Sequence, residues 1–168
     1  MDRKIMAFLL LIFISSCNSK ETESKYLRWV GDIAEDLTID DPDFEVCREK
    51  KAMQYFNFSR GLQYKGEKYA LEKEVREKYD PGEVSPESGL IRIRFIVNCK
   101  GQTGRFRITA MDSTYQEKQF DTLITEQLLS IVRGLKGWKM MPDNENPKDY
   151  YQYLIFKIDN GQIIEILP

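Results

Sequence analysis

The chain has 168 residues, enough for one compact core but too few for two ordinary domains with a linker. Charged residues make up 31% and apolar residues 42%, a balance typical of globular proteins rather than of disordered or fibrous ones. The formal net charge of −2 removes the broad electrostatic argument for a nucleic-acid partner. The absence of histidine excludes Ser-His-Asp catalysis, Cys-His catalysis and His-ligated zinc.

Residues 1–16 are typical of a secretory signal peptide, with a basic start at Arg3 and Lys4 and an unbroken apolar run over residues 6–14. In a helix this run would span about 14 Å at ~1.5 Å per residue, roughly half of a bilayer core, which disfavours a permanent membrane span. Two small serines lead into Cys17, and residues 14–17 resemble the lipobox of bacterial lipoproteins. The resemblance implies that Cys17 is lipidated and becomes the mature N-terminus. The alternative is an ordinary cleaved signal peptide in which Cys17 stands by chance.

On the lipoprotein interpretation the protein is exported and membrane-anchored in the cell envelope, facing the periplasm. Residues 17–25 are mostly polar and show no periodicity, so they predict a short flexible tether between the lipid and the folded part.

Residues 26–63 form an acidic and aromatic N-terminal extension. An apolar set recurs there at helical spacing and predicts a short amphipathic helix that ends near Thr38: Tyr26, Trp29, Val30, Ile33 and Leu37. The acidic run at residues 40–43 lacks the central glycine and the terminal glutamate of an EF-hand loop, which favours a solvated turn over a calcium site. Residues 54–58 carry three aromatic side chains and predict either a strand or an aromatic clamp onto the core.

Residues 64–168 predict a single α+β domain. Its first helix is expected over residues 67–79, where apolar side chains fall on one stripe and i,i+4 charge pairs on the other side. Alternating apolar and polar residues then predict strands over residues 90–98 and 105–111.

The two strands predict an antiparallel hairpin around the turn at Lys100-Gly101. The register that sets Ile93 opposite Ile108 also sets Phe95 opposite Phe106. The opposite face of the hairpin then carries four arginines together: Arg92, Arg94, Arg105 and Arg107.

A second helix is predicted over residues 125–135, followed directly by Trp138. A third strand is expected over residues 150–158, with Tyr151 and Tyr153 facing outward. The sequence Asp-Asn-Gly at 159–161 is a strong hairpin turn, after which residues 163–167 would form a fourth strand. The sequence thus predicts a three- to four-stranded antiparallel sheet with two helices packed on one face, preceded by the N-terminal extension.

Cysteine usage follows from the compartment. With Cys17 lipidated, only Cys47 and Cys99 remain, and an exported protein meets an oxidising environment. A Cys47–Cys99 disulfide is favoured over two unpaired thiols. Two cysteines without histidines or a C-x-x-C pair do not make a zinc site, so no metal and no cofactor is expected.

Four segments in order resemble the TonB C-terminal domain family, especially copies in small envelope proteins. They are a Gly-containing lead into the first helix (Tyr64–Leu71), an alternating strand that ends in Val-Asn (Gly89–Asn98), the turn Lys100-Gly101, and Gly137-Trp138-Lys139 after the second helix. The resemblance covers roughly residues 64–158. It implies a three-stranded antiparallel sheet backed by two helices, and a periplasmic role in contacting outer-membrane receptors.

The family also implies a binding mode in which a short receptor segment adds to the last strand, here residues 150–158, as an extra strand. Two features depart from a TonB energy transducer. A lipidation signal and a linker of a few residues replace the inner-membrane helix and long Pro-rich spacer, so energy transduction itself is disfavoured. In addition, a fourth strand over residues 163–167 would fill the docking edge.

These observations predict a lipid-anchored, non-catalytic protein-binding module rather than an enzyme, bound to an envelope protein such as an outer-membrane receptor or transport component. Candidate partner-binding residues belong to types enriched at binding hot spots: Arg92, Arg94, Arg105, Arg107, Trp138, Tyr151 and Tyr153. The competing interpretations are that Trp138 packs in the core and that the arginines pair with the acids of residues 32–45. Alternative functions are a structural envelope lipoprotein that reuses the fold, or a hydrolase that uses two carboxylates on a glycan.

Overall fold

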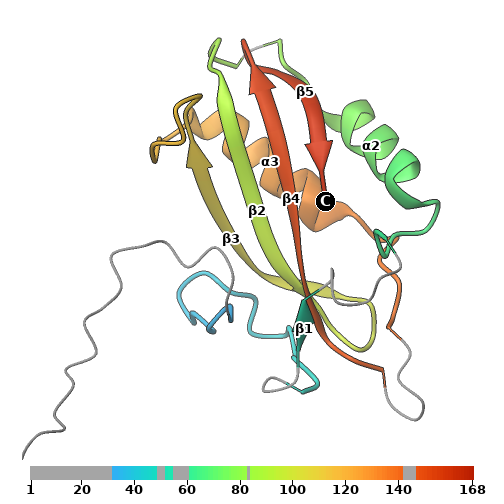
Figure 1. Ribbon diagram of the computed structural model, residues 1–168. Coiled ribbons are helices and arrows are strands. Elements are labelled where there is room, and N and C mark those ends of the chain that lie inside the picture. The colour runs from blue at the N-terminus through green and yellow to red at the C-terminus, as the bar shows by residue number, and fades with distance from the viewer. Residues whose placement is uncertain (1–31, 49–51, 55–60, 83, 142–146) are drawn as a thin grey trace, which may run out of the picture. The chain divides into compact units, whose positions relative to one another are not determined.

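The computed structural model describes residues 32–48, 52–54, 61–82, 84–141 and 147–168 (Figure 1). The chain divides into two compact units, residues 1–32 and 33–168, and every element named below belongs to the second. In chain order these elements are β1 (Met53–Gln54), α2 (Glu67–Lys78), β2 (Gly89–Val97), β3 (Thr103–Met111), α3 (Thr122–Gly134), β4 (Tyr150–Asp159) and β5 (Gln162–Leu167). The fold is α+β, with two helices and a mixed five-stranded sheet in the described residues.

The elements predicted over residues 64–168 are all present, with ends within three residues of the expected ones. The strand β1 adds to the prediction because its two residues pair parallel to β4, which makes the sheet mixed. Of the segment predicted as a strand or clamp, Gln54 lies in β1 and residues 55–58 lie outside the described residues.

The sheet order is β1-β4-β2-β3, and β5 also pairs with β4 (Figure 1). The outer side of β4 pairs with β1 at Tyr150 and Tyr151 and with β5 from Ile155 to Asp159. The last strand of the family-like core is therefore interior to the sheet. The docking edge that the family resemblance implies along residues 150–158 is therefore mostly covered, by the predicted fourth strand and by β1.

The β2–β3 ladder has the predicted register in the part farther from the turn, from the Leu90–Met111 pair to the Arg94–Arg107 pair, and Ile93 lies opposite Ile108. A bulge then shifts the pairing by one residue, and Arg105 takes the left-handed backbone conformation with φ of 52°. The ladder skips Phe95, so the predicted Phe95–Phe106 strand pair is wrong. Their rings nevertheless stack with centroids 5.3 Å apart.

The main core lies between the sheet and the two helices. Alternate residues of β2 point to this side and are buried, Ile91, Ile93, Phe95 and Val97. They pack with the apolar stripes of the helices, including Leu71 and Val75 of α2 and Ile124, Leu128 and Val132 of α3. Burial of each such side chain contributes roughly 1.5–3 kcal/mol to stability.

Local signals position α3 on this core. Asp121 caps the helix, since its carboxylate accepts a hydrogen bond from the backbone N–H of Leu123 at 2.9 Å. Gly137, after the helix, allows the chain to pass against Tyr64: a Cβ at this position would lie 2.5 Å from the tyrosine ring.

The opposite face of the sheet is covered, at the end nearest the β2–β3 turn, by residues 33–48, which we call the strap. The strap contains no helix or strand, and residues 37–40 form a turn. The helix predicted to end near Thr38 is therefore wrong for residues 32–38, while Tyr26, Trp29 and Val30 lie outside the described residues. Leu37 is 83% exposed, whereas Ile33 is buried in a second cluster with Ile96 and Tyr151. Packing onto the sheet has overridden the helical spacing.

Candidate functional site

Two of the four predicted arginines are held by the strap. Arg107 makes a two-pronged ion pair with Asp40, at 2.6 and 2.7 Å, and also donates to the carbonyl oxygen of Ala34 at 2.7 Å. Arg105 is buried, with a guanidinium nitrogen 3.3 Å from the carboxylate of Glu35. The interpretation that the arginines pair with acids of residues 32–45 is confirmed for these two, so neither is presented to a partner as a solvated charge.

The Asp40–Arg107 pair fixes the turn of the strap on β3. The side chain of Asp40 is only 6% exposed. The hydrogen bonds from Arg107 lower the pKa of the Asp40 carboxyl despite this burial, and they raise the pKa of Arg107.

The other two arginines remain on the same face of β2. Arg92 is buried and its guanidinium lies 4.4 Å from the centre of the Tyr153 ring, a cation–π contact. Arg94 is half-buried in the same row. The predicted gathering of arginines on one face is present, but much of their surface is used inside the chain.

Trp138 and Tyr151 are also buried. Trp138 is 6% exposed and packs edge-on against Tyr64 and Phe95, with ring centres 5.0 and 5.1 Å away. Its competing interpretation as a core residue is therefore confirmed. Tyr151 is 4% exposed beneath the strap. Only Tyr153 among the three aromatic candidates keeps a half-buried ring.

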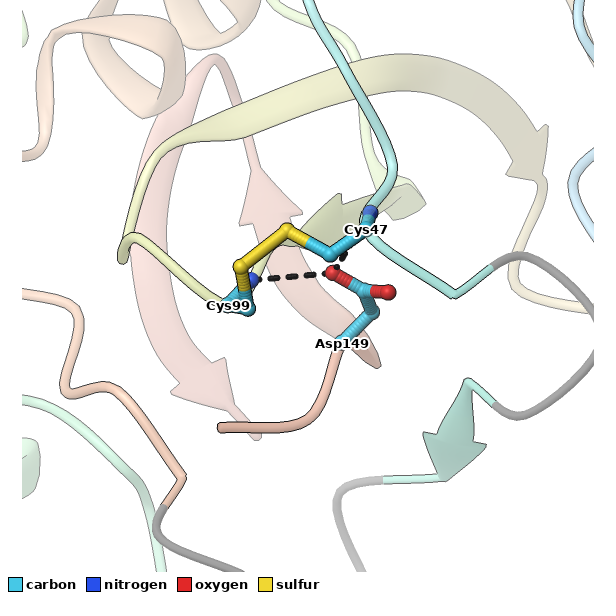
Figure 2. A group of neighbouring side chains, drawn as sticks. All are labelled: Cys47, Cys99 and Asp149. Atoms are coloured by element: carbon cyan, nitrogen blue, oxygen red, sulfur yellow. Dashed lines mark hydrogen bonds between the residues drawn. A yellow bond between two sulfur atoms is a disulfide. The ribbon is translucent and has the colours of Figure 1, made fainter. Parts of the chain in front are cut away.

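The predicted Cys47–Cys99 disulfide is present and joins the strap to the β2–β3 turn (Figure 2). The two Cα atoms are 6.1 Å apart. Both sulfurs and a carboxylate oxygen of Asp149 lie within 4.8 Å of one another, a set that could hold a metal ion if the thiols were free. In the disulfide neither sulfur is a thiolate ligand, so the group is a structural crosslink. We call the Cys47–Cys99 disulfide the staple.

Asp149 was not predicted, and it organises this staple. Its Oδ1 atom accepts hydrogen bonds from the backbone N–H groups of both cysteines, at 3.2 Å for Cys47 and 2.9 Å for Cys99. Its other oxygen accepts from the backbone N–H of Arg48. Asp149 is 1% exposed, so a buried charge is satisfied by three backbone donors. The only sequence signal for the role of Asp149 was its position immediately before a predicted strand.

Asn98 completes the attachment of the strap. Its amide nitrogen donates to the carbonyl oxygen of Glu45 at 2.9 Å. Its amide oxygen accepts from the backbone N–H groups of Lys100 and Gln102. The asparagine that ends the family-like strand motif therefore shapes the hairpin turn and ties the strap to it.

A groove runs along the outer edge of β3, between the strap and the C-terminal end of α3; we call it the edge groove. One cavity of about 370 Å³ is lined by Ile39, Asp40, Asp41, Thr103, Gly104, Arg105, Phe106, Arg133 and Lys136. A neighbouring cavity of about 300 Å³ is lined by Asp41, Asp43, Phe44, Gly101, Gln102, Thr103, Leu135 and Lys136. The two cavities share Asp41, Thr103 and Lys136, so they are parts of one groove.

Another cavity, of about 410 Å³, lies at the opposite end of the sheet. It is lined by Ser88, Gly89, Leu90, Asp112, Ser113, Tyr115, Lys157, Ile158, Asp159 and Ile164. Two carboxylates line this cavity, and both accept hydrogen bonds from neighbouring groups. Asp112 accepts from the backbone N–H groups of Thr114 and Gln116, and Asp159 accepts from the hydroxyl of Ser88. The acids of the edge groove lie on the strap, where Asp40 is bound to Arg107 and Asp41 accepts from the backbone N–H of Asp43.

No family model matches the chain, and no curated protein or solved structure is significantly similar to it. In the part of the chain that the structure describes, no helix is both long and apolar enough to cross a membrane. Cys17 lies outside the described residues.

Proposed function

We propose that this protein is an exported, lipid-anchored, non-catalytic protein-binding module of the bacterial envelope, associated with TonB-type transport. The signal peptide, the cysteine after it and the family-like order of segments over residues 64–158 support export and the link to transport. The observation that carries the binding role is the outer edge of β3. This strand has nine residues and lies at the end of the sheet order, with β2 on one side and the edge groove on the other.

A strand edge that is open at Thr103, beside a groove, suits protein recognition, because its backbone groups bind another chain with little demand on sequence. The partner would be an envelope protein, such as an outer-membrane receptor or transport component. The arginine face contributes to the module mainly by holding the strap in place. The two remaining alternatives, a structural lipoprotein and a carboxylate hydrolase, have no comparable feature in their favour.

The lipid anchor is tested by metabolic labelling with an alkyne fatty acid. The wild-type chain should incorporate the label and fractionate with membranes, and a Cys17→Ala variant should not incorporate it. Labelling of the variant to the wild-type level would rule out Cys17 as the attachment site.

The binding role is tested by photo-crosslinking in intact cells. A photoreactive residue at Lys136, on the wall of the edge groove, should capture an envelope protein. The matched control is the same residue at Lys73, an exposed position of α2 whose side chain is 61% accessible. Capture of no protein, or of the same proteins from both positions, would contradict the proposal.

A further inference from the structure

The backbone of β3 shows what the edge groove can bind. The backbone N–H of Asn98 donates to the carbonyl of Gln102 at 2.8 Å, so Gln102 turns its backbone toward β2. Backbone direction alternates along an antiparallel strand, and Val97–Thr103 is therefore a pair without hydrogen bonds between its members. The N–H and C=O of Thr103 consequently point away from β2 and into the groove.

The available edge of β3 is short, because its other end is already paired. Ala110 accepts a hydrogen bond from the backbone N–H of Lys118 at 3.0 Å, which closes the edge there. The bulge at Arg105 interrupts the alternation midway. Beyond it the carbonyl oxygen of Phe106 accepts a hydrogen bond from the guanidinium of Arg107 at 2.8 Å, which leaves the backbone groups at Thr103, on the other side of the bulge, to face the groove. The edge thus accommodates a short extended segment of a few residues rather than a long strand.

The two sides of the groove, which we call its strap bank and its α3 bank, carry opposite charges. The strap side presents Asp41 and Asp43, both exposed, while the α3 side presents the exposed Arg133 and Lys136. None of these four side chains forms an ion pair with another residue that the structure describes. Asp40, also on the strap side, is neutralised by Arg107.

An added strand would match this pattern in a specific way. Successive side chains of a strand point to opposite faces of the sheet. One set would face the α3 bank on the inner face, and the alternate set would face the strap on the outer face. Phe44 of the strap lies against Gly104 on that outer face, and Arg133 lies 5.4 Å from the Phe106 ring on the inner face.

We propose that the edge groove binds an extended segment of a partner protein as an added strand, in which acidic side chains facing α3 alternate with basic side chains facing the strap. This inference rests on the proposed protein-binding function and names the chemistry of the partner. Backbone hydrogen bonds at Thr103 supply affinity, and the two charged banks select the sequence.

The first test uses peptides and the oxidised full domain. A fluorescent octapeptide of alternating Glu and Lys should bind in a polarisation assay. A peptide of the same composition with Glu and Lys in two blocks should bind at least fivefold more weakly. Two further alternating peptides carry backbone N-methyl groups, one at the odd and one at the even positions. One of the two should bind at least tenfold more weakly than the unmethylated peptide, because its N–H groups that face the β3 edge are blocked.

The second test changes the protein. Thr103→Pro removes the groove-facing N–H but no bond to β2, so it should weaken binding at least tenfold and leave unfolding unchanged. Thr103→Val is the matched control and should bind as the wild type does. Charge reversal on the α3 side, by Arg133→Glu with Lys136→Glu, should weaken binding about tenfold. Adding Asp41→Lys with Asp43→Lys reverses the strap side as well and should restore binding, because the alternating peptide can then bind shifted by one residue.

Equal binding of the alternating and block peptides, or unchanged binding to the Thr103→Pro variant, would overturn the inference. If Lys136 still captures an envelope protein in cells under that outcome, the proposed function stands without strand addition. A concentration-dependent dimer that Thr103→Pro abolishes would assign the edge to a second copy of the chain and would likewise overturn the inference.

Discussion

The face of the sheet that carries Ile91, Ile93 and Phe95 is sealed by two helices, whereas the face that carries Ile96 and Tyr151 is covered by a strap without regular secondary structure. The first face is held mainly by apolar packing, to which Arg76 and Tyr79 add hydrogen bonds to backbone carbonyls of Ile163 and Gly161. The second combines a small apolar cluster with ion pairs, a disulfide and a buried carboxylate. The difference shows that a covering segment without amphipathic periodicity needs specific polar and covalent attachments, since its apolar contact area is small.

The largest effect should come from the helix-covered face. Phe95→Ala removes a fully buried ring that contacts both Phe106 and Trp138. The free energy of unfolding should fall by about 4 kcal/mol, as for other buried aromatic truncations. Urea denaturation measures the change. The matched variant Ile33→Ala, on the strap-covered face, should cost less, and an equal or larger cost for it would remove the distinction between the two faces.

Loss of the staple should come next. The disulfide closes a loop with a sequence separation of 52 residues. The double variant Cys47→Ser with Cys99→Ser should lower the free energy of unfolding by about 3–4 kcal/mol in the chain-entropy account. Relative to the wild type, hydrogen exchange should accelerate more in residues 33–48 than in α3, because the strap loses a direct attachment and α3 does not. Uniform acceleration across both regions would contradict this division.

A smaller effect is expected from the buried carboxylate. Asp149→Asn keeps the shape but replaces a charged acceptor of three backbone N–H groups with a neutral amide. We expect the free energy of unfolding to fall by about 2–3 kcal/mol. Asp159→Asn, an exposed position at the end of the same strand, is the control and should change stability by less than about 0.5 kcal/mol. Similar values for both variants would show that Asp149 does not organise the staple.

The smallest effect is pH-dependent and belongs to the strap alone. Because the folded pKa of Asp40 is lowered, its pair with Arg107 stabilises the fold above the ordinary carboxyl pKa of 3.8, and this contribution is lost as the pH falls through the lowered value. At neutral pH the free energy of unfolding of the wild type should be about 1 kcal/mol higher than that of the Asp40→Asn variant. Denaturation of both proteins across the acid range should show the difference disappear at low pH; a difference that persisted there would exclude this origin.

The helix-covered half of the molecule could be predicted from sequence because each element carries a local signal. The alternation over residues 90–98 gave β2 and the Ile93–Ile108 register, and the turn at 159–161 gave β5. Such signals fail where contacts are distant along the chain. Ile33 and Leu37 shared a helical spacing, yet only Ile33 meets the sheet.

The candidate site was less predictable for the same physical reason. The disulfide followed from counting cysteines, but the position of Asp149 between the two cysteines depends on residues about a hundred positions apart. The edge groove consists of backbone groups and of charged side chains on separate elements, and no motif contains them together. A two-residue parallel strand such as β1 is also too short to leave a pattern.

The covalent link between Cys47 and Cys99 has a consequence for proteolysis. A protease that cuts the chain once anywhere between these residues leaves both fragments joined through sulfur. Nicked molecules would therefore migrate as intact protein on a non-reducing gel and separate only when a reductant is added. A cut between Cys99 and Tyr150 has no such protection, and it would detach β4 and β5 once the chain unfolds.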